Sequence, residues 1–337
     1  MTGGPTTRMH ALAPSVDALV DGASTREPME SADSKSGARF ERVIIDGDAF
    51  VVKHVDRAYD WIARQTGDLA CWPIVVWERG LVDLAPDCID HTIVGAARTA
   101  TGGALLMRDV STWLVRAGDT PLPLEQHLRF LDHLAAFHTA CWGWEDTIGL
   151  WPLGNRYGLF GPEALACEAA LGHPEPVTRI AEGGWVRLNE VAPGMAAALA
   201  PLRSAPWPLL DALAALPRTF LHGDWKLGNL GSHPDGRTVL VDWSIPGSGP
   251  PLAELAHYLA LNNARLPVGH TKDDAIAAYR ASLERHGIDT EPWFERQLAL
   301  CLLGVMLQLG WEKSFDEQGD ERAWWAARVD AGVRELR

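Results

Sequence analysis

Residues 220–230 read Phe-Leu-His-Gly-Asp-Trp-Lys-Leu-Gly-Asn-Leu, and residues 239–243 read Val-Leu-Val-Asp-Trp. The first stretch places a carboxylate, Asp224, and an amide, Asn229, shortly after an apolar run. A second carboxylate, Asp242, ends the next apolar run. An aspartate, an asparagine and a strand-terminal aspartate in this order are typical of a site that positions phosphate groups with a metal ion.

The sequence between the two stretches predicts a β-hairpin. Asp235-Gly236 lies midway, and Asp-Gly is a strong signal for a two-residue hairpin turn. With this turn, Asn229 and Asp242 lie directly opposite each other, with Cβ atoms about 5 Å apart on one face. An amide oxygen and a carboxylate at that separation can share a hard cation such as Mg²⁺, with phosphate oxygens and water completing the octahedron. A longer turn would shift this register.

Asp224 lies upstream in the connecting loop, where it can face an incoming hydroxyl. A purely structural hairpin is the alternative interpretation, because Asp-Gly turns occur in many strands. A phosphotransferase site is favoured by several polar residues and a glycine that occur together at these spacings, with helical sequence after them. These residues are His222, Gly223, Asp224, Asn229 and Asp242.

This segment resembles the aminoglycoside phosphotransferase and choline kinase-like family, whose members are relatives of the protein kinases. Residues 222–229 match the family pattern His-Gly-Asp-x-x-x-x-Asn, residues 242–243 match its Asp-Trp pair, and residues 247–255 match its Gly- and Pro-containing stretch before a helix. Glu254 stands where many members carry Asp, and we interpret it as structural. The resemblance is specific across residues 220–260 and weaker across residues 34–330.

The resemblance implies an α+β, two-lobed protein-kinase-like fold. It places a flexible N-terminal segment and a short helix in residues 1–30. A small antiparallel-sheet N-lobe that binds nucleotide follows in residues 31–110, and a larger, mainly helical C-lobe with the catalytic loop and substrate-binding helices in residues 111–337. A chain of 337 residues suits two lobes.

The resemblance also implies roles for the polar residues, with Mg²⁺ as cofactor and ATP, or GTP as the alternative, as co-substrate. Asp224 would accept a hydrogen bond from the acceptor hydroxyl and take its proton late. Asn229 and Asp242 would hold Mg²⁺. Lys226 would reach the transferring phosphoryl group; its alternative interpretation is a solvated loop lysine. His222 is expected to brace the loop by hydrogen bonding.

A second hairpin is predicted over residues 39–55, with its turn at Asp46-Gly47 and Lys53 opposite Phe40. A lysine inside an apolar strand needs an anionic partner, because burying an unpaired ammonium is costly. In the family resemblance this lysine holds the α- and β-phosphates. The alternative is an edge-strand lysine that faces water. Asp60 is the nearest candidate for the helix carboxylate that pairs with this lysine in kinases.

Two further nucleotide contacts follow from the resemblance. The loop before the second hairpin, which contains Ser36 and Gly37, would cover the phosphates. Residues 104–110 read as a strand that leaves the small lobe, so Met107 and Asp109 would contact the adenine through backbone groups. Beyond this strand, helices are predicted over residues 124–141, 252–263, 271–286, 291–310 and 320–336.

Composition narrows the class of protein. A net charge of −14 argues against non-specific nucleic-acid binding and is compatible with a cationic substrate. The five cysteines show no Cys-x-x-Cys spacing, and we expect reduced thiols in a cytoplasmic protein. The first fourteen residues lack an apolar core, so no signal peptide is expected. The apolar run of residues 298–309 suits a buried helix rather than a membrane span.

The leading hypothesis is a small-molecule kinase whose acceptor is an aminoglycoside, an amino sugar or an amino alcohol. Acidic residues between Glu312 and Glu321 would attract amino groups, or would simply form a solvated loop and helix start. A nucleotide-binding pseudokinase or binding module is the alternative. A protein kinase fits less well, because the chain lacks the His-Arg-Asp arginine, and Ser244 replaces the Gly of Asp-Phe-Gly. The sequence does not identify the acceptor or the oligomeric state.

Overall fold

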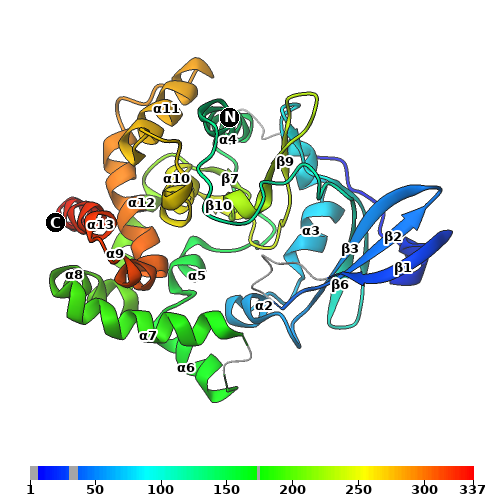
Figure 1. Cartoon of the computed structure of the whole chain (residues 1–337), viewed down its shortest axis with the longest axis horizontal. Helices are drawn as coiled ribbons and strands as arrows, with labels where there is room; N and C mark the ends of the chain where they lie inside the picture. Colours follow the sequence, from blue (N-terminus) through cyan, green and yellow to red (C-terminus); the bar gives the residue numbers. More distant parts are fainter. Residues whose placement is uncertain (1–6, 30–36, 173–174) are drawn as a thin grey trace. The chain divides into compact units, whose positions relative to one another are not determined.

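The computed structural model describes residues 7–29, 37–172 and 175–337, which fall into two compact units (Figure 1). The first unit combines the chain up to Cys141 with His222–Pro246 and Ala264–His286. The second combines Trp142–Leu221, Gly247–Asn263 and Gly287–Arg337. An antiparallel sheet dominates the first unit and helices the second, so the predicted α+β fold class is confirmed.

The main sheet has five antiparallel strands in the order β1-β2-β3-β6-β5. Their bounds are β1 Ala23–Met29, β2 Arg39–Ile45, β3 Asp48–Asp56, β5 Ile93–Arg98 and β6 Gly102–Arg108. The predicted register of the β2–β3 hairpin is confirmed, because Phe40 pairs with Lys53. Asp46 and Gly47 have φ angles of 53° and 91°, as a two-residue turn with two left-handed residues requires. Figure 1 shows β3 in the interior of the sheet.

The two faces of this sheet differ in character. Val43, Val52 and Leu106 lie on one face, where they form a small apolar core with the short helix α1 (Val16–Leu19). Lys53 and Phe40 lie on the other face, because directly opposed residues of an antiparallel pair point the same way. The helix α3 (Trp72–Glu78) packs on β5 and β6.

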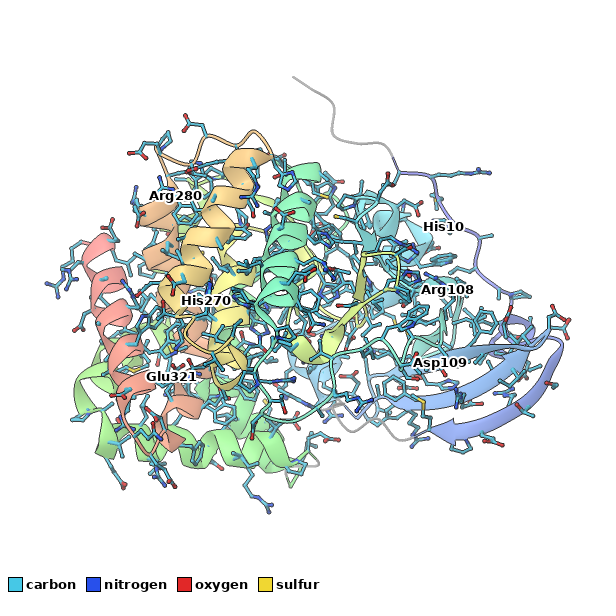
Figure 2. All side chains as sticks on the ribbon, turned by 45° about the horizontal axis from the view of Figure 1, so that its top comes forward. His10, Arg108, Asp109, His270, Arg280 and Glu321 are labelled. Atoms are coloured by element: carbon cyan, nitrogen blue, oxygen red, sulfur yellow. The ribbon has the colours of Figure 1, made fainter. Side chains whose placement is uncertain are left out.

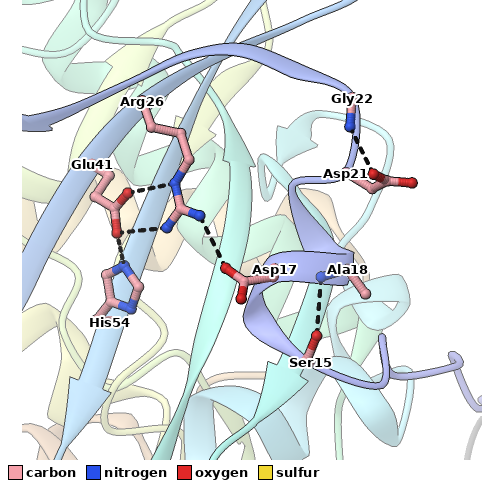
Figure 3. Close-up of polar contacts among 8 residues, drawn as sticks. All are labelled: Ser15, Asp17, Ala18, Asp21, Gly22, Arg26, Glu41 and His54. Atoms are coloured by element: carbon pink, nitrogen blue, oxygen red, sulfur yellow. Dashed lines mark hydrogen bonds and ion pairs between the residues drawn. The ribbon is translucent and has the colours of Figure 1, made fainter.

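A polar network stabilises the exposed edge of the sheet (Figure 3). Arg26 on β1 donates two hydrogen bonds to Glu41 on β2 and a third to Asp17 of α1. His54 on β3 contacts the same Glu41 at 2.6 Å. One glutamate therefore connects three neighbouring strands. The pKa of Glu41 lies below its usual value, mainly because Arg26 donates to it.

A second, three-stranded sheet in the first unit has the order β4-β9-β8. Its strands are β4 Ile89–Asp90, β8 Leu230–Ser232 and β9 Thr238–Leu240. The remaining helices of this unit are α2 Trp61–Thr66, η1 Leu81–Leu84, α4 Leu124–Ala140, η2 Leu227–Asn229 and α11 Lys272–Arg285. β4 pairs in parallel with β9. Residues 89–90 therefore add a third strand to the hairpin that carries the candidate site residues.

The second unit is mainly helical. Its elements are α5 Leu153–Gly158, α6 Pro162–Ala170, α7 Pro176–Val191, α8 Pro193–Ser204, α9 Trp207–Ala214, β7 Thr219–Leu221, β10 Gly247–Gly249, α10 Leu252–Leu261, α12 Phe294–Leu309, η4 Gly310–Phe315 and α13 Asp320–Glu335; η3 Asn263–Arg265 joins the units. The segment Phe294–Phe315 is long and apolar enough to cross a membrane, but 83% of its apolar window is buried within the protein. It is the core helix that the sequence predicted.

Candidate phosphotransferase site

The β8–β9 hairpin has a longer turn than the sequence predicted. Leu230 pairs with Leu240, and the His233 amide donates to the Arg237 carbonyl at 2.9 Å, so three residues form the loop. Gly236 has a φ of 96°, the left-handed residue that follows a type I turn in a three-residue hairpin loop. The predicted pairing of Asn229 with Asp242 is therefore wrong by one position.

Asn229 instead lies opposite Val241, whose amide donates to the Asn229 carbonyl at 3.0 Å. A slip of one residue would send the Asp242 side chain to the other face of a regular strand. Asp242, however, lies beyond β9 and has a φ of 68°, which is rare for a residue other than glycine. This left-handed residue redirects the chain, and both Asn229 and Asp242 line the same cavity.

The loop that leads to Asp224 is fixed by its two preceding residues. Gly223 has a φ of 92°, and a Cβ atom there would lie 1.9 Å from the Ile245 carbonyl oxygen, so only glycine fits. His222 is fully buried and accepts a hydrogen bond from the Asp224 amide at its Nδ1. The His222 ring also packs edge-on against Trp243, with the ring centroids 4.7 Å apart. His222 thus braces the loop, as the sequence predicted.

Asp224, Lys226 and Asn229 form one hydrogen-bonded group. The Asn229 Nδ2 donates to the Asp224 carbonyl at 2.9 Å and to its Oδ2 at 2.8 Å. The Lys226 ammonium lies 2.8 Å from the same Oδ2. Because the amide nitrogen of Asn229 is committed to Asp224, its amide oxygen points away from that carboxylate. The loop aspartate and the asparagine are thereby held in a fixed relation.

Lys53 connects the main sheet to this hairpin. Its side chain is only 4% exposed, and its ammonium donates to Asp242 Oδ1 at 2.6 Å and to Ser244 Oγ at 2.9 Å. Burial disfavours the charged form of Asp242, but the attraction of Lys53 and Lys226 outweighs both burial and the repulsion of Asp224. The pKa of Asp242 therefore lies below its usual value. Lys53 has the anionic partner that its burial requires, and does not face water.

A cavity of about 140 Å³ opens beside these groups. Lys53, Asn229 and Asp242 form its polar end, and its walls are mainly apolar; the lining includes Phe40, Val51, Met107, Val110, Leu114 and Val241. Met107 and Asp109 both line this cavity. An apolar slot that ends in a few convergent polar groups is the usual form of a small-molecule site.

Asp109 has a structural partner at the cavity. Its Oδ2 lies 2.7 Å from Arg42, and its Oδ1 accepts from the Ser111 amide. Burial raises the pKa of Asp109, but the hydrogen bonds from Ser111 and the contact with Arg42 bring it below the usual value. Figure 2 shows Asp109 directly after Arg108, the last residue of β6. The chain leaving β6 is thus tied back to β2.

Gly37 and Asp60 have placements that differ from those predicted. Gly37 precedes β2 with a φ of 85° and is not among the residues that line the cavity. Ser36 lies outside the described residues. Asp60 is the N-cap of α2, where it accepts from the Ala63 amide. It has no ion pair with Lys53 in the described part of the chain, because Lys53 pairs with Asp242 instead.

The donor set fits a hydrated Mg²⁺ ion. Asp242 Oδ2 and Asn229 Oδ1 accept no hydrogen bond within the described residues, and both residues line the cavity. No group of three or more His, Cys, Asp or Glu side chains able to hold a metal ion occurs in the described ranges. Mg²⁺ usually takes one or two protein oxygens and completes its octahedron with phosphates and water, so two donors are sufficient.

Ser244 was not predicted as a site residue. Its hydroxyl accepts from Lys53 and donates to Asp242 Oδ1 at 2.5 Å. A role for Ser244 could have been predicted because its hydroxyl lies two residues after the strand-terminal carboxylate, at the position where protein kinases have glycine. Phe40 and Val51 of the cavity wall could have been found as neighbours of Lys53 on one sheet face.

The acidic residues between Glu312 and Glu321 are engaged within the second unit. The buried Lys313 lies 3.2 Å from Glu312 and 3.5 Å from Glu321 (labelled in Figure 2). Glu321 also accepts from the Trp325 indole, and Asp316 accepts from the Arg322 amide. These contacts favour the structural interpretation of the acidic run over attraction of a cationic substrate.

Comparisons with known proteins concern the segment that carries these site residues. Residues 178–290 match the model of the phosphotransferase enzyme family. This segment is similar to that family. It contains Asp224, Lys226, Asn229 and Asp242, and the match confirms the resemblance seen in the sequence. No curated protein sequence shows significant similarity to the chain.

Solved structures are similar to nearly the whole chain in fold. The choline kinase LicA from Streptococcus pneumoniae is 12% identical, with a TM-score of 0.52 over 94% of this chain and 96% of its own. A structure of LicA in complex with AMP is 13% identical, with a TM-score of 0.52 over 93% and 91%. An aminoglycoside phosphotransferase from Alicyclobacillus acidocaldarius subsp. acidocaldarius has 14% identity, 97% coverage of both chains and a TM-score of 0.46. At such identities the LicA matches establish the fold alone.

Proposed function

We propose that this chain is a Mg²⁺-dependent small-molecule kinase that transfers the γ-phosphoryl group of ATP to a hydroxyl of an amino-group-bearing acceptor. The observation that carries the proposal is the convergence of Lys53, Asn229 and Asp242 on one cavity, with Asp224 joined to it through Asn229. The match of residues 178–290 to the phosphotransferase enzyme family and the fold shared with LicA, which has been solved in complex with AMP, support it.

Each site residue has its own role in the proposed phosphoryl transfer. Catalysis of such a transfer depends mainly on positioning and charge stabilisation. Mg²⁺, held by Asn229 and Asp242, would neutralise negative charge on the phosphates. Lys53, buried beside Asp242, provides a fixed positive charge for the α- and β-phosphates. Met107 and Asp109 lie where the base would enter the apolar part of the cavity.

Asp224 and Lys226 act on the acceptor side of the proposed reaction. The acceptor oxygen forms a bond to the γ-phosphorus, the bond to the β-bridging oxygen breaks, and ADP leaves. Asp224 orients the hydroxyl and receives its proton, as a positioned general base. Lys226, which lies 2.8 Å from Asp224, offers a point charge to the transferring group. Aminoglycosides, amino sugars and amino alcohols are the proposed acceptor classes, and the proposed location is the cytoplasm.

The test is acceptor-dependent ADP release by the purified chain with Mg²⁺-ATP. The panel holds aminoglycosides, amino sugars, amino alcohols, neutral sugars and hydroxylated amino acids, and the control is Asp224→Ala. The expected result is release with an amino-bearing acceptor that falls by about 10²–10⁴-fold in the variant. Nucleotide binding without transfer to any acceptor would support a binding module instead, and release unchanged in Asp224→Ala would contradict the assigned base.

A further inference from the structure

Arg39, the first residue of β2, has no acidic partner within the described ranges, and its side chain lies over an aromatic ring. Its guanidinium carbon is 4.4 Å from the centre of the Tyr59 ring, the distance of a cation–π contact. Tyr59 follows β3 and is half-buried, whereas Arg39 is exposed. A guanidinium over a ring keeps its N–H donors at the edge of its plane, where they can bind a ligand.

The carboxylates of this region have other hydrogen-bond donors. Glu41, two residues along β2, accepts from Arg26 (Figure 3). Asp56, the last residue of β3, and Asp60 accept from backbone amides. Within the described part of the chain, none of these three groups forms an ion pair with Arg39, although the protein has a net charge of −14. The positive charge of Arg39 therefore remains available to an anionic ligand.

The register of the β2–β3 hairpin places Arg39 beyond Lys53 along the cavity. Arg42 on β2 contacts Asp109, at the end of the cavity where the base is proposed to enter. Phe40, two residues nearer the start of β2, lies opposite Lys53. Arg39 follows in the same direction, away from the base.

Tyr59 lies at the same end of the hairpin. It follows β3, the strand that carries Lys53, and it directly precedes Asp60. The pKa of Asp60 is raised mainly by burial and is also shifted by the charges of Lys53 and Asp242, so Asp60 is close to the polar end of the cavity. The Tyr59 ring therefore holds the Arg39 guanidinium on the side where a phosphate chain that starts at Lys53 would continue.

We propose that Arg39 binds the terminal phosphate of the nucleotide, with the Tyr59 ring as the platform that holds its guanidinium in place. Arginine suits this role because its planar fork donates two hydrogen bonds to phosphate oxygens and stacks on an aromatic face. The inference rests on the proposed function, because it requires a nucleotide whose α- and β-phosphates lie at Lys53. The contact between Lys53 and Asp242 stays as the structure has it.

The experiment measures binding of ADP and of the non-hydrolysable ATP analogue adenylyl imidodiphosphate by calorimetry in Mg²⁺. Its readout is the ratio of the analogue affinity to the ADP affinity, because ADP lacks the phosphate that Arg39 would bind. The variants are Arg39→Gln, Tyr59→Leu, which removes the ring, and Tyr59→Phe, which keeps it. Arg42→Gln is the matched control: it removes the same charge from the same strand, but Arg42 contacts Asp109 at 2.7 Å. Thermal unfolding without nucleotide reports any purely structural damage.

We expect Arg39→Gln to lower the ratio about tenfold, the effect of losing a hydrogen bond between charged groups. Tyr59→Leu should lower it about threefold, because a cation–π contact at an exposed site is weaker. Tyr59→Phe and Arg42→Gln should leave the ratio unchanged.

A ratio in Arg39→Gln within twofold of the wild type would overturn the inference, as would an equal fall in Arg42→Gln. An unchanged ratio in Tyr59→Leu would overturn the role of the ring as a platform. Wild-type protein that binds neither ADP nor the analogue would overturn the proposed function itself.

Discussion

Two hairpins in this chain turn on the same dipeptide, Asp-Gly, and fold differently. In the β2–β3 hairpin, Asp46 and Gly47 both have positive φ angles and form a two-residue turn. In the β8–β9 hairpin, only Gly236 has a positive φ, and the loop has three residues. The first hairpin has the register that the sequence predicted, and the second is shifted by one.

The residue before the dipeptide accounts for the difference. Pro234 precedes Asp235, and proline fixes the φ angle that the second residue of a type I turn needs. Gly236 then takes the left-handed position that closes a three-residue loop. The first hairpin has Ile45 at the equivalent place, so nothing extends its turn. An Asp-Gly signal therefore has to be read together with its preceding residue.

Asp242→Ala should have the largest effect on nucleotide affinity, and this effect should distinguish the β8–β9 hairpin from the β2–β3 hairpin. Its carboxylate is proposed to hold Mg²⁺, so the variant should lose about 100-fold or more in Mg²⁺-nucleotide affinity, as expected for removal of several kcal/mol of charge stabilisation. Calorimetric titration with the non-hydrolysable ATP analogue measures this.

The matched control for that variant lies at the end of the other hairpin. Asp56, the last residue of β3, accepts from the Ala58 amide and from Thr101, and it does not line the cavity. Asp56→Ala should lower stability and leave nucleotide affinity unchanged. Equal losses of affinity in both variants would remove the distinction between a functional and a structural hairpin.

Two glycines, one near each hairpin, allow the two regions to be compared by the free energy of unfolding. Gly223 and Gly47 have φ angles of 92° and 91°, but a Cβ atom would lie 1.9 Å from the Ile245 carbonyl at Gly223 and would meet nothing within 4 Å at Gly47. Gly47→Ala should cost about 1–2 kcal/mol, from the left-handed backbone alone. Gly223→Ala should cost about 3–5 kcal/mol, since the backbone must also move. Urea unfolding measures both, and similar losses would contradict the crowding at Gly223.

Asp60 provides a smaller test, because it is affected by residues from both hairpins. Burial raises the pKa of Asp60 to about 6; attraction to Lys53 opposes this rise, and repulsion from Asp242 adds to it. The favourable contribution of protonated Asp60 is fully present below pH 3.8 and is lost as the pH rises through 6. At neutral pH the ionised group should therefore cost about 3 kcal/mol.

Asp60→Asn removes this cost and keeps a good N-cap for α2. The variant should be more stable than the wild type by about 3 kcal/mol above pH 7, with the difference falling toward zero near pH 4. Urea unfolding at pH 4.5 and 7.5 gives the comparison. A difference in stability that does not change between the two pH values would show that Asp60 does not titrate in this range.

The sequence predicted the parts of the fold that depend on local signals. The apolar alternation around Lys53, the turn at Asp46-Gly47 and the long helices near residues 124–141 and 320–336 were all found in place. β1 was missed, because its residues are polar and largely exposed and include Pro28, as an edge strand allows. Its stability comes from the Arg26–Glu41 contacts with the next strand, which leave no periodic pattern.

The sequence predicted which residues form the site, but not all of the contacts between them. Asn229 and Asp242 were placed together by a register that is wrong, and they meet because Asp242 adopts a left-handed conformation. Asp46 is followed by a glycine that signals a left-handed turn, whereas Asp242 has no such signal and is held by contacts with Lys53 and Ser244. Those contacts join residues far apart in the chain, which single-sequence patterns do not report.

The pairing of β4 with β9 has a consequence for folding. Ile89 and Thr238 are neighbours in this parallel pair although they lie roughly 150 residues apart in the chain, and closing so long a loop is slow. On a ribosome, the hairpin that carries Asn229 and Asp242 emerges long after β4, which must wait without its partner. The first unit therefore completes its second sheet late during synthesis, and a chain interrupted before residue 238 would leave β4 as an open edge available to other molecules.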